Sequence, residues 1–494
     1  MSPASSYENR KWYSGMFIQE DWWSVWLGMT FVFLGLCSIF GPDLVGWVAN
    51  PHAWSAGTPF EKMIAPMGKG YTSWGPWGSL IASYVFISIP VCLGAYCMGW
   101  NFKKFVGGWT CIFVITYASW IIGHHATITA TSREWSKYGI SFGLGLGGGG
   151  SYILALFVGL FIGNFMKGFA HYLSEAAKPE WFIKTAIVFL GVKVGYMAIK
   201  AAGFVMELAV AGAAATIVAY LIFWPGTYFI ARRFFHFGRK TSAVLASGVS
   251  ICGVSAAVAT AGAVRSKPLV PIMVSALIVV YAVVELVVLP PIFSSTMSSE
   301  PIVAGAAMGM SVKTDGADGA AGAVLDELMR AAKLDKDGVT YEEGSITISA
   351  VMTKVWIDMF IGLWAFVLAM VWVYKIDKVP GEHVPASEVW HRFPKFVLGY
   401  FLAWGVYLAI LFLTPQLAPA AKIGAVPVEG GMRKLFFMLT FVSIGCITDF
   451  KKLAQSHFGK LIFVYFIALF VYIVPVAVIV AYVFHHGMMP PMAG

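Results

Sequence analysis

The sequence has little charge. Asp, Glu, Lys and Arg make up 12% of its 494 residues, whereas roughly a quarter of an average soluble domain is charged. Hydrophobic residues reach 59%, and the mean hydropathy is +0.75. Polar groups are too few to cover a water-soluble globule, so the lipid bilayer must be the main solvent. Aromatic residues reach 16%, which suits the belts that form at membrane–water interfaces.

Motifs for catalysis and for metal binding are also absent. The sequence has no phosphate-binding loop, serine nucleophile elbow or HExxH zinc helix, so we expect no enzyme. His124 and His125 end an aromatic run and are expected at the interface. The six cysteines lie in apolar stretches without CxxC or Cys/His spacing. This predicts buried thiols and neither a metal site nor a cofactor; the cysteines are Cys37, Cys92, Cys97, Cys111, Cys252 and Cys446.

The net charge of +9 does not indicate nucleic-acid binding. The Lys and Arg residues are scattered through short loops between apolar runs, which is the pattern of the positive-inside rule. The strongest basic loop spans 232–240. We place that side in the cytoplasm of a bacterial cell, with the protein in the inner membrane, the N-terminus inside and the C-terminus outside. The first apolar run is full length, which argues against a cleavable signal peptide.

Apolar runs long enough to cross a bilayer recur along the whole chain. A transmembrane helix needs about 20 mostly apolar residues. This predicts an all-α polytopic membrane protein with about thirteen spans: Trp22–Phe40, Trp77–Trp100, Phe105–Thr127, Gly149–Met166, Trp181–Ala201, Val205–Ile230, Thr241–Val264, Leu269–Phe293, Ile302–Leu325, Ile346–Tyr374, Phe396–Leu413, Leu435–Phe450 and Lys460–Phe484.

The chain divides into two parts. Residues 1–147 form an N-terminal extension with about three spans, and residues 148–494 form a ten-helix core. A polar stretch at 326–344 is expected to be a solvent loop with a short helix. A faint similarity between 190–196 and 444–450 indicates an internal repeat, a mark of many transporter folds.

Two segments differ from ordinary spanning helices. Residues 246–260 are almost all small, which fits either a tight helix–helix interface or a backbone that unwinds along a cavity. In residues 305–319 an apolar, glycine-rich run meets Lys313, Asp315 and Asp318. Either the helix ends before these charges, or it is a broken helix whose tips face a central cavity.

Further charges interrupt other apolar runs. Ionisable residues within a membrane are candidates for function, although those near helix ends can reach the interface instead. Lys354 and Asp358 lie four residues apart and share a helix face, so they can pair. The others are Lys193, Glu285 and Asp449, with Glu175 and Glu207 expected at the interface.

From about residue 152 to residue 459 the chain resembles the YeiH-type family of proposed sulfate exporters. The glycine- and serine-rich stretch at 248–256 is the most specific match, and the order and spacing of all five stretches agree. They are ALFVGLFIGN at 155–164, IVFLGVK at 187–193, GVSICGVSA at 248–256, AVMTK at 350–354 and SIGCITDF at 443–450.

The resemblance implies a fold akin to bile-acid symporters and cation–proton exchangers, with an inverted-repeat core and an elevator-like motion. It makes Ser250–Ser255 and Gly309–Asp318 a pair of crossing broken helices. Relatives often carry a His-Glu pair and a Gln in the second segment, where this chain has Thr314, Asp315 and Asp318. A basic residue that usually follows the family lysine is missing after Lys354. The extension has no counterpart in short members.

Three hypotheses follow. In the first, the protein is a secondary transporter of a small anion of the sulfate, sulfite or organosulfonate class, and Na⁺ or H⁺ drives it. The second hypothesis keeps the fold and makes the protein a cation–proton antiporter. The third is a membrane sensor or scaffold that transports nothing. By analogy with elevator proteins we expect a homodimer.

The first hypothesis assigns a role to each candidate site residue. The expected anion-binding residues are Lys313, Thr314, Ser311, Ser250, Cys252, Gly253, Ser255, Lys193 and Asn164. The expected coupling-ion residues are Asp315, Asp318, Lys354 and Asp358.

Overall fold

The computed structural model describes residues 15–200, 202–267, 269–377, 390, 393–449, 451 and 459–493. Within these residues the chain is mostly helical, with one two-stranded antiparallel sheet of β1 (Ala49–Pro51) and β2 (Ile64–Pro66). In this described part of the chain, eight helices are long and apolar enough to cross a membrane, and nine if a bent pair counts as one span. That pair is α7 (Gly149–Phe165) and α8 (Lys167–Leu173), and the chain bends by 116° between them. The chain is therefore a multi-pass membrane protein.

All thirteen predicted segments contain helix, but several are broken or short, so the count of about thirteen spans remains a prediction. Short helical elements complete the described chain: η2 (Cys37–Phe40), α2 (Phe60–Met63), η3 (Lys69–Trp74), α5 (Ala126–Thr129), η4 (Ser132–Glu134), α6 (Trp135–Tyr138), η5 (Ile230–Phe234), η6 (Trp372–Ile376), η7 (Pro415–Leu417), η8 (Pro427–Met432) and η9 (Ile467–Ile473).

The first of two helix bundles is built around α9 (Pro179–Lys200). Glycines on α9 allow close packing: a Cβ at Gly191 would lie 2.3 Å from the carbonyl oxygen of Tyr400. The N-terminal helices pack on this bundle and complete it. Its other members are α1 (Glu20–Leu36), α3 (Gly75–Cys97), α4 (Phe102–Gly123), α7, α19 (Phe396–Leu413), α20 (Ala418–Val426) and α21 (Arg433–Ile447).

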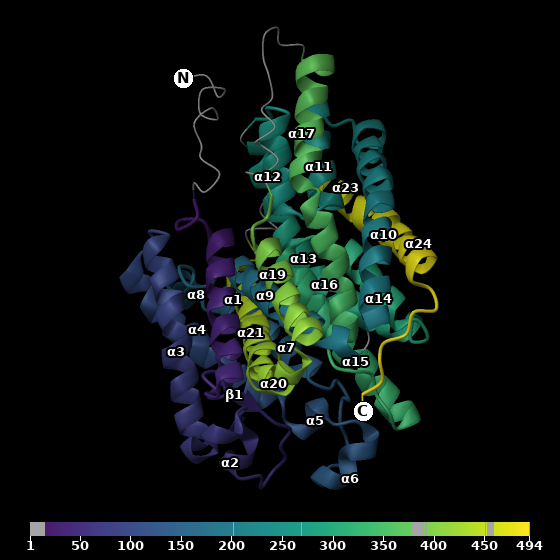
Figure 1. Cartoon of the computed structure of the whole chain (residues 1–494). Helices are drawn as coiled ribbons and strands as arrows, with labels where there is room; N and C mark the ends of the chain where they lie inside the picture. The colour runs from purple at the N-terminus through teal and green to yellow at the C-terminus, as the bar shows by residue number, and fades with distance from the viewer. Residues whose placement is uncertain are drawn as a thin grey trace.

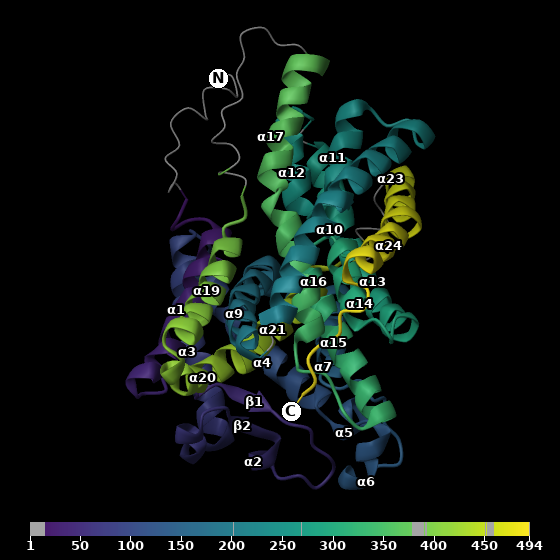
Figure 2. The same ribbon diagram turned by 45° about the vertical axis from the view of Figure 1, so that its right-hand side comes forward.

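The second bundle lies beside the first, and Figure 2 shows the two next to each other. Helix α15 contacts α7, α9 and α21 and so joins the two bundles. The members of the second bundle are α10 (Ala202–Phe229), α11 (Arg239–Ser250), α12 (Val254–Ala263), α13 (Leu269–Thr296), α14 (Pro301–Ser311), α15 (Asp315–Asp337), α16 (Ser345–Met359), α17 (Ile361–Val371), α23 (Gly459–Phe466) and α24 (Val474–His485).

The small-residue segment is broken, as one of the two alternatives predicted, and its halves fold back on each other. Helices α11 and α12 pack side by side. The Thr260 hydroxyl donates to Ser247 Oγ at 2.7 Å, and a Cβ on Gly248 would lie 3.4 Å from Ala257 Cβ. The residue nearer the break in α11, Gly248, contacts the residue nearer the break in α12, Ala257, and the more distant Ser247 contacts the more distant Thr260, so α11 and α12 form an antiparallel hairpin. We call it hairpin 1, and its tip is 251–253.

The second glycine-rich segment is also broken and forms a second hairpin. Both legs, α14 and α15, lie along α16. Ser349 Oγ donates to the carbonyl of Ile302 at 2.9 Å, and Thr347 Oγ1 donates to the carbonyl of Gly322 at 3.4 Å. Residues 302 and 322 thus lie beside 347–349 of α16, whereas residues 312 and 313 lie beside Lys354, farther along that helix. The chain therefore runs along α16 in α14 and returns in α15. We call this hairpin 2, and its tip is 312–314.

The two hairpins enter the bundle from opposite ends. Helix α13 leads from the base of hairpin 1 to the base of hairpin 2, and its 28 residues at about 1.5 Å each cover about 42 Å. In Figure 1, α11 and α12 accordingly lie above α14 and α15. The expectation of crossing helices is therefore wrong, because each chain segment turns back at its break and does not continue through.

The polar stretch at 326–344 also differs from the expected loop. Helix α15 continues to Asp337, so only the residues after it are a connection. Asp326 is buried and accepts backbone hydrogen bonds from Gly344 at 3.1 Å and Ile346 at 2.8 Å. Its carboxylate caps the N-terminus of α16, which explains why an acidic residue is tolerated inside the fold.

Candidate functional site

The tips of the two hairpins touch inside the second bundle. Gly253 has φ of +68°, a conformation that L side chains rarely adopt, and a Cβ there would lie 2.7 Å from the carbonyl oxygen of Lys313. Glycine is therefore required both for the turn and for the contact. Each tip brings together the C-terminal end of one helix and the N-terminal start of the next.

Lys354 binds the carbonyl groups of both tips. From α16 its ammonium donates to the carbonyl of Ile251 at 3.0 Å in tip 251–253, and to Val312 and Lys313 at 3.4 and 3.5 Å in tip 312–314. These carbonyls lie at the C-terminal ends of α11 and α14, where the helix dipole is negative. A buried ammonium, 1% exposed, compensates that charge. Lys354 thus acts as an internal cation between the tips.

Lys313 lies at the tip, but its side chain does not line the cavity, although it was expected to bind the anion. Its side chain turns back, so that the ammonium donates to the carbonyl of Met310 and lies 5.3 Å from the centre of the Phe223 ring. Its backbone amide donates to Glu285 Oε2 at 3.0 Å. Glu285, which is fully buried on α13, therefore holds the tip, while Lys313 stabilises the end of α14.

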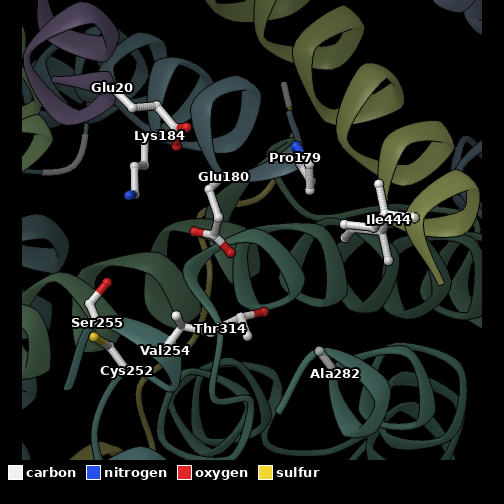
Figure 3. Close-up of a pocket in the computed structure, with 11 residues that line it drawn as sticks. Glu20, Pro179, Glu180, Lys184, Cys252, Val254, Ser255, Ala282, Thr314 and Ile444 are labelled. Carbon is white, nitrogen blue, oxygen red and sulfur yellow. The ribbon is translucent and has the colours of Figure 1, made fainter. Parts of the chain in front are cut away.

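A cavity of about 270 Å³ lies directly beside the tips, between the two bundles. Figure 3 shows its lining. The second bundle contributes Cys252, Val254, Ser255 and Thr314 from the tips and helix starts, together with Ala282 of α13. The first bundle contributes Glu20 of α1, Pro179, Glu180 and Lys184 of α9, and Ile444 and Ile447 of α21.

The cavity faces the N-terminal starts of α12 and α15. In α12 the first intrahelical hydrogen bond comes from Ala257 to the carbonyl of Gly253, so the amides before Ala257 have no helical acceptor. Thr314 is the N-cap of α15, and its hydroxyl accepts from the amide of Ala317 at 3.0 Å. Helix starts carry partial positive charge. The tip side of the cavity is therefore suited to an anion.

The opposite wall of the cavity carries side chains that the sequence analysis missed. Glu180 and Lys184 lie one turn apart at the start of α9, and Lys184 forms an ion pair with Asp21 Oδ1 at 2.8 Å. The sequence did contain a signal for these two residues, because an acid and a base four residues apart share one face of a helix.

Of the predicted anion-binding residues, the structure brings Cys252, Ser255 and Thr314 to the cavity and Gly253 to the tip beside it. The Ser250 hydroxyl donates to Thr227 at 3.3 Å, and Ser311 is buried in α14. The Asn164 amide donates to the carbonyls of Leu160 and Thr448. These three residues, like Lys313, do not line the cavity.

Lys193 belongs to a different cluster. It lies on α9 but is paired with Glu342 at 3.3 Å and Glu429 at 3.5 Å, away from the cavity. Arg433 and Lys434 bind Glu343 at 3.4 and 2.9 Å. Glu342 and Glu343 belong to the connection after hairpin 2, whereas the cations belong to the first bundle. This ion cluster therefore ties the base of hairpin 2 to the first bundle.

The predicted coupling residues lie within the second bundle. Asp318 and Asp358 are buried on α15 and α16 and do not line the cavity. The side chain of Asp315 lies outside the described part of the chain. In the residues that are described, no group of three His, Cys, Asp or Glu side chains is arranged to hold a metal ion.

Most of the remaining charged or polar candidates have structural partners. Asp449 pairs with Lys167 at 2.8 Å, and Glu175 accepts from the amide of Asn101 at 2.9 Å. Glu207 is exposed on α10. His124 contacts the carbonyl of Trp120 at 2.9 Å, and the His125 ring packs at 4.5 Å on Trp54. None of these residues lines the cavity.

Comparison with known proteins places the chain among membrane proteins. A family model described as "Conserved hypothetical protein 698" matches residues 144–464. The chain is 52% identical over 486 residues to a UPF0324 membrane protein of Nitrosomonas europaea, which covers 98% of this chain and 99% of that protein. It is 28% identical over 431 residues to a UPF0324 membrane protein of Rhodopirellula baltica, covering 85% and 71%. No solved structure matches the chain.

Proposed function

This chain belongs to the conserved hypothetical protein 698 family of UPF0324 membrane proteins, and we propose that it is a secondary transporter of a small anion. The proposed site is the cavity between the hairpin tips and the first bundle. Substrates of the sulfate, sulfite or organosulfonate class suit it. Such a protein belongs in the bacterial inner membrane, with the N-terminus in the cytoplasm, and a homodimer is expected by analogy.

The observation that carries the proposal is the polarity of the tips. Their carbonyl ends, where a metal cation would bind, already hold the ammonium of Lys354. Their amide ends face the cavity through Val254, Ser255 and Thr314. Half-helix starts that point at an anionic substrate are a recurring device of transporters built from discontinuous helices. This arrangement favours an anion over the cation–proton exchange considered as an alternative.

The surroundings of the cavity support alternating access. Two features lie between the two bundles. The cavity lies at the start of α9, and the ion cluster around Lys193 and Glu342 lies farther along the same helix. Nine residues separate Lys184 from Lys193 on α9, or about 13 Å along a helix. A shift of the second bundle, which carries both hairpins, against the first bundle would open the space at the ion cluster and close the cavity. That is an elevator-like motion.

We assign coupling to H⁺ or Na⁺ to buried carboxylates of the second bundle. Glu285 binds the tip through one oxygen, while Glu285 Oε1 has no hydrogen-bond partner in the described residues. Asp318 lies one turn into α15. Protonation of such groups changes how the tips are held, which links proton binding to the cavity.

Flux into proteoliposomes tests the proposal. Purified protein is reconstituted and loaded with unlabelled anion, and uptake of labelled sulfate, sulfite and ethanesulfonate is measured. We expect uptake of at least one anion that falls at least tenfold in Ser255→Trp, which fills the cavity, and not in the exposed control Glu207→Gln. No flux of any anion, together with no binding, would contradict the proposal and favour a sensor or scaffold.

A further inference from the structure

A second cavity, of about 220 Å³, lies at the base of hairpin 2. It is lined by the end of α13, the last turns of α15 and the connection that follows α15. Its polar lining includes Ser294, Ser298, Ser299, Lys333, Lys336 and Asp337. None of these residues lines the cavity beside the hairpin tips, so the two cavities are separate sites.

The second cavity lies where a membrane span ends. Helix α13 is a candidate span that ends at Thr296, and Ser298 and Ser299 follow it directly. One to two turns before that end, Val288 and Ile292 are 38% and 46% exposed, so these apolar side chains face the lipid. Headgroups of a bilayer lie at the ends of its hydrophobic spans. The cavity is therefore at headgroup level, beside a surface suited to acyl chains.

The lining of this cavity carries an excess of positive charge. Asp337 is its one acidic residue in the described part of the chain, and the Asp337 carboxylate pairs with Lys333 Nζ at 2.5 Å. Lys336 lies on the same face of α15 and adds a second ammonium group. Two ammonium groups thus stand against one carboxylate. A ligand group with a single negative charge would balance them.

The negative end of α15 does not oppose such a ligand, because its last carbonyl groups already have donors. Arg133 donates from Nε to the carbonyl of Asp335 at 2.6 Å and from Nη2 to that of Lys336 at 2.8 Å. The amide of Gly338 donates to the carbonyl of Leu334 at 3.0 Å. These donors offset the partial negative charge of the helix end.

Hydroxyl groups on the α13 side of the cavity can complete an anion site. Ser298 and Ser299 are exposed, and each hydroxyl can donate one hydrogen bond to a phosphate oxygen. The adjacent Glu300 is directed elsewhere: its carboxylate contacts His486 Nδ1 at 2.7 Å and accepts from the amide of Gly487 at 3.2 Å. A lysine ammonium beside hydroxyl donors is a common arrangement for binding phosphate.

We propose that this cavity binds the phosphate group of an anionic phospholipid, with Lys336, Ser298 and Ser299 as donors and the acyl chains along α13. Basic pockets between membrane helices are known to bind acidic headgroups. Phosphatidylglycerol, with one negative charge, matches the excess of one positive charge. Phosphatidylcholine carries the same phosphate but brings a further cation beside Lys336, so it binds more weakly. The proposal does not depend on whether the protein transports an anion.

Lipid binding to the purified full chain tests this assignment. The protein is delipidated in detergent and titrated with phosphatidylglycerol or phosphatidylcholine, and native mass spectrometry counts the bound lipids. We expect the first phosphatidylglycerol to bind with a Kd at least tenfold lower than the first phosphatidylcholine. Because a ligand of the folded state stabilises it, phosphatidylglycerol should also raise the melting midpoint.

Variants locate the bound phosphate. Lys336→Gln and the double variant Ser298→Ala with Ser299→Ala should each raise the Kd of the first phosphatidylglycerol at least fivefold, whereas Lys336→Arg should keep it close to the wild type. Ala332→Trp fills the cavity without a change of charge and should abolish this binding step. Lys375→Gln, an exposed lysine at the end of another span, is the matched control for general loss of charge.

Inorganic phosphate separates the two sources of the same chemical group. If free phosphate binds with the same dependence on Lys336 and no lipid binds there, the ligand is a soluble phosphate and the lipid assignment is wrong. If the two lipids bind equally, or if Lys336→Gln and Ala332→Trp bind phosphatidylglycerol like the Lys375→Gln control, the cavity is not a phosphate site and the proposal is overturned.

Discussion

Replacing Lys354 by methionine removes the cation between the hairpin tips while it keeps a side chain of similar length. The ammonium donates to Ile251 at 3.0 Å and, over longer distances, to Val312 and Lys313. A hydrogen bond to a charged group contributes about 1.5–3 kcal/mol, and weaker long contacts contribute less. Methionine avoids the cost of burying an ammonium, which offsets part of the loss. We expect a net destabilisation of about 3 kcal/mol.

Function should suffer more than stability. Without the ammonium, the carbonyl ends of α11 and α14 face each other across the tips, and the tips should separate or bind a solvent cation. We therefore expect the melting midpoint of Lys354→Met in detergent to fall by several degrees and anion flux to fall at least tenfold. The control is Lys375→Met, an exposed lysine of η6 on the same span. A variant that melts and transports like the wild type would refute the role of Lys354.

Two further substitutions test separate features of the site. Gly253→Ala places a Cβ against the Lys313 carbonyl at a positive φ, so we expect the protein to lose about 2 kcal/mol or more of stability, measured by thermal melting. The control is Gly203→Ala, where a Cβ would meet no atom within 4 Å. An unchanged melting midpoint of Gly253→Ala would contradict the contact between the tips. Lys193→Met removes the ion pair with Glu342 at 3.3 Å, which joins the two bundles, so hydrogen exchange in 338–344 should rise. Equal exchange in the variant and the wild type would mean that the ion cluster does not hold that connection.

The sequence was sufficient to find both breaks because their residues are unusual. Runs of Gly, Ala and Ser within an apolar chain permit an unwound backbone, and the structure interrupts both segments at the predicted places. The direction of the chain after each break could not be read in the same way. It depends on the dihedral angles of residues such as Gly253 and on contacts such as Thr260 with Ser247, which exist only in the folded state.

The roles of individual charges were harder to predict. Lys354 was placed among the coupling-ion residues, and the structure shows that its ammonium reaches carbonyls more than forty residues away in the chain. Lys193 was expected at the substrate site because it interrupts an apolar run, and acids from 342 and 429 pair with it instead. Glu180 and Lys184 drew no attention because they stand near the expected start of a span, where charges are common.

Protection of Cys252 tests most directly whether the cavity beside the tips holds the transported anion. Cys252 lines the cavity, so a variant in which the other five cysteines are replaced reports on that place alone. A small neutral methanethiosulfonate is added to proteoliposomes with and without a saturating concentration of an anion that the protein transports. We predict that the substrate slows modification of Cys252 at least tenfold. An unchanged rate of modification in the presence of a transported substrate would show that the substrate binds elsewhere.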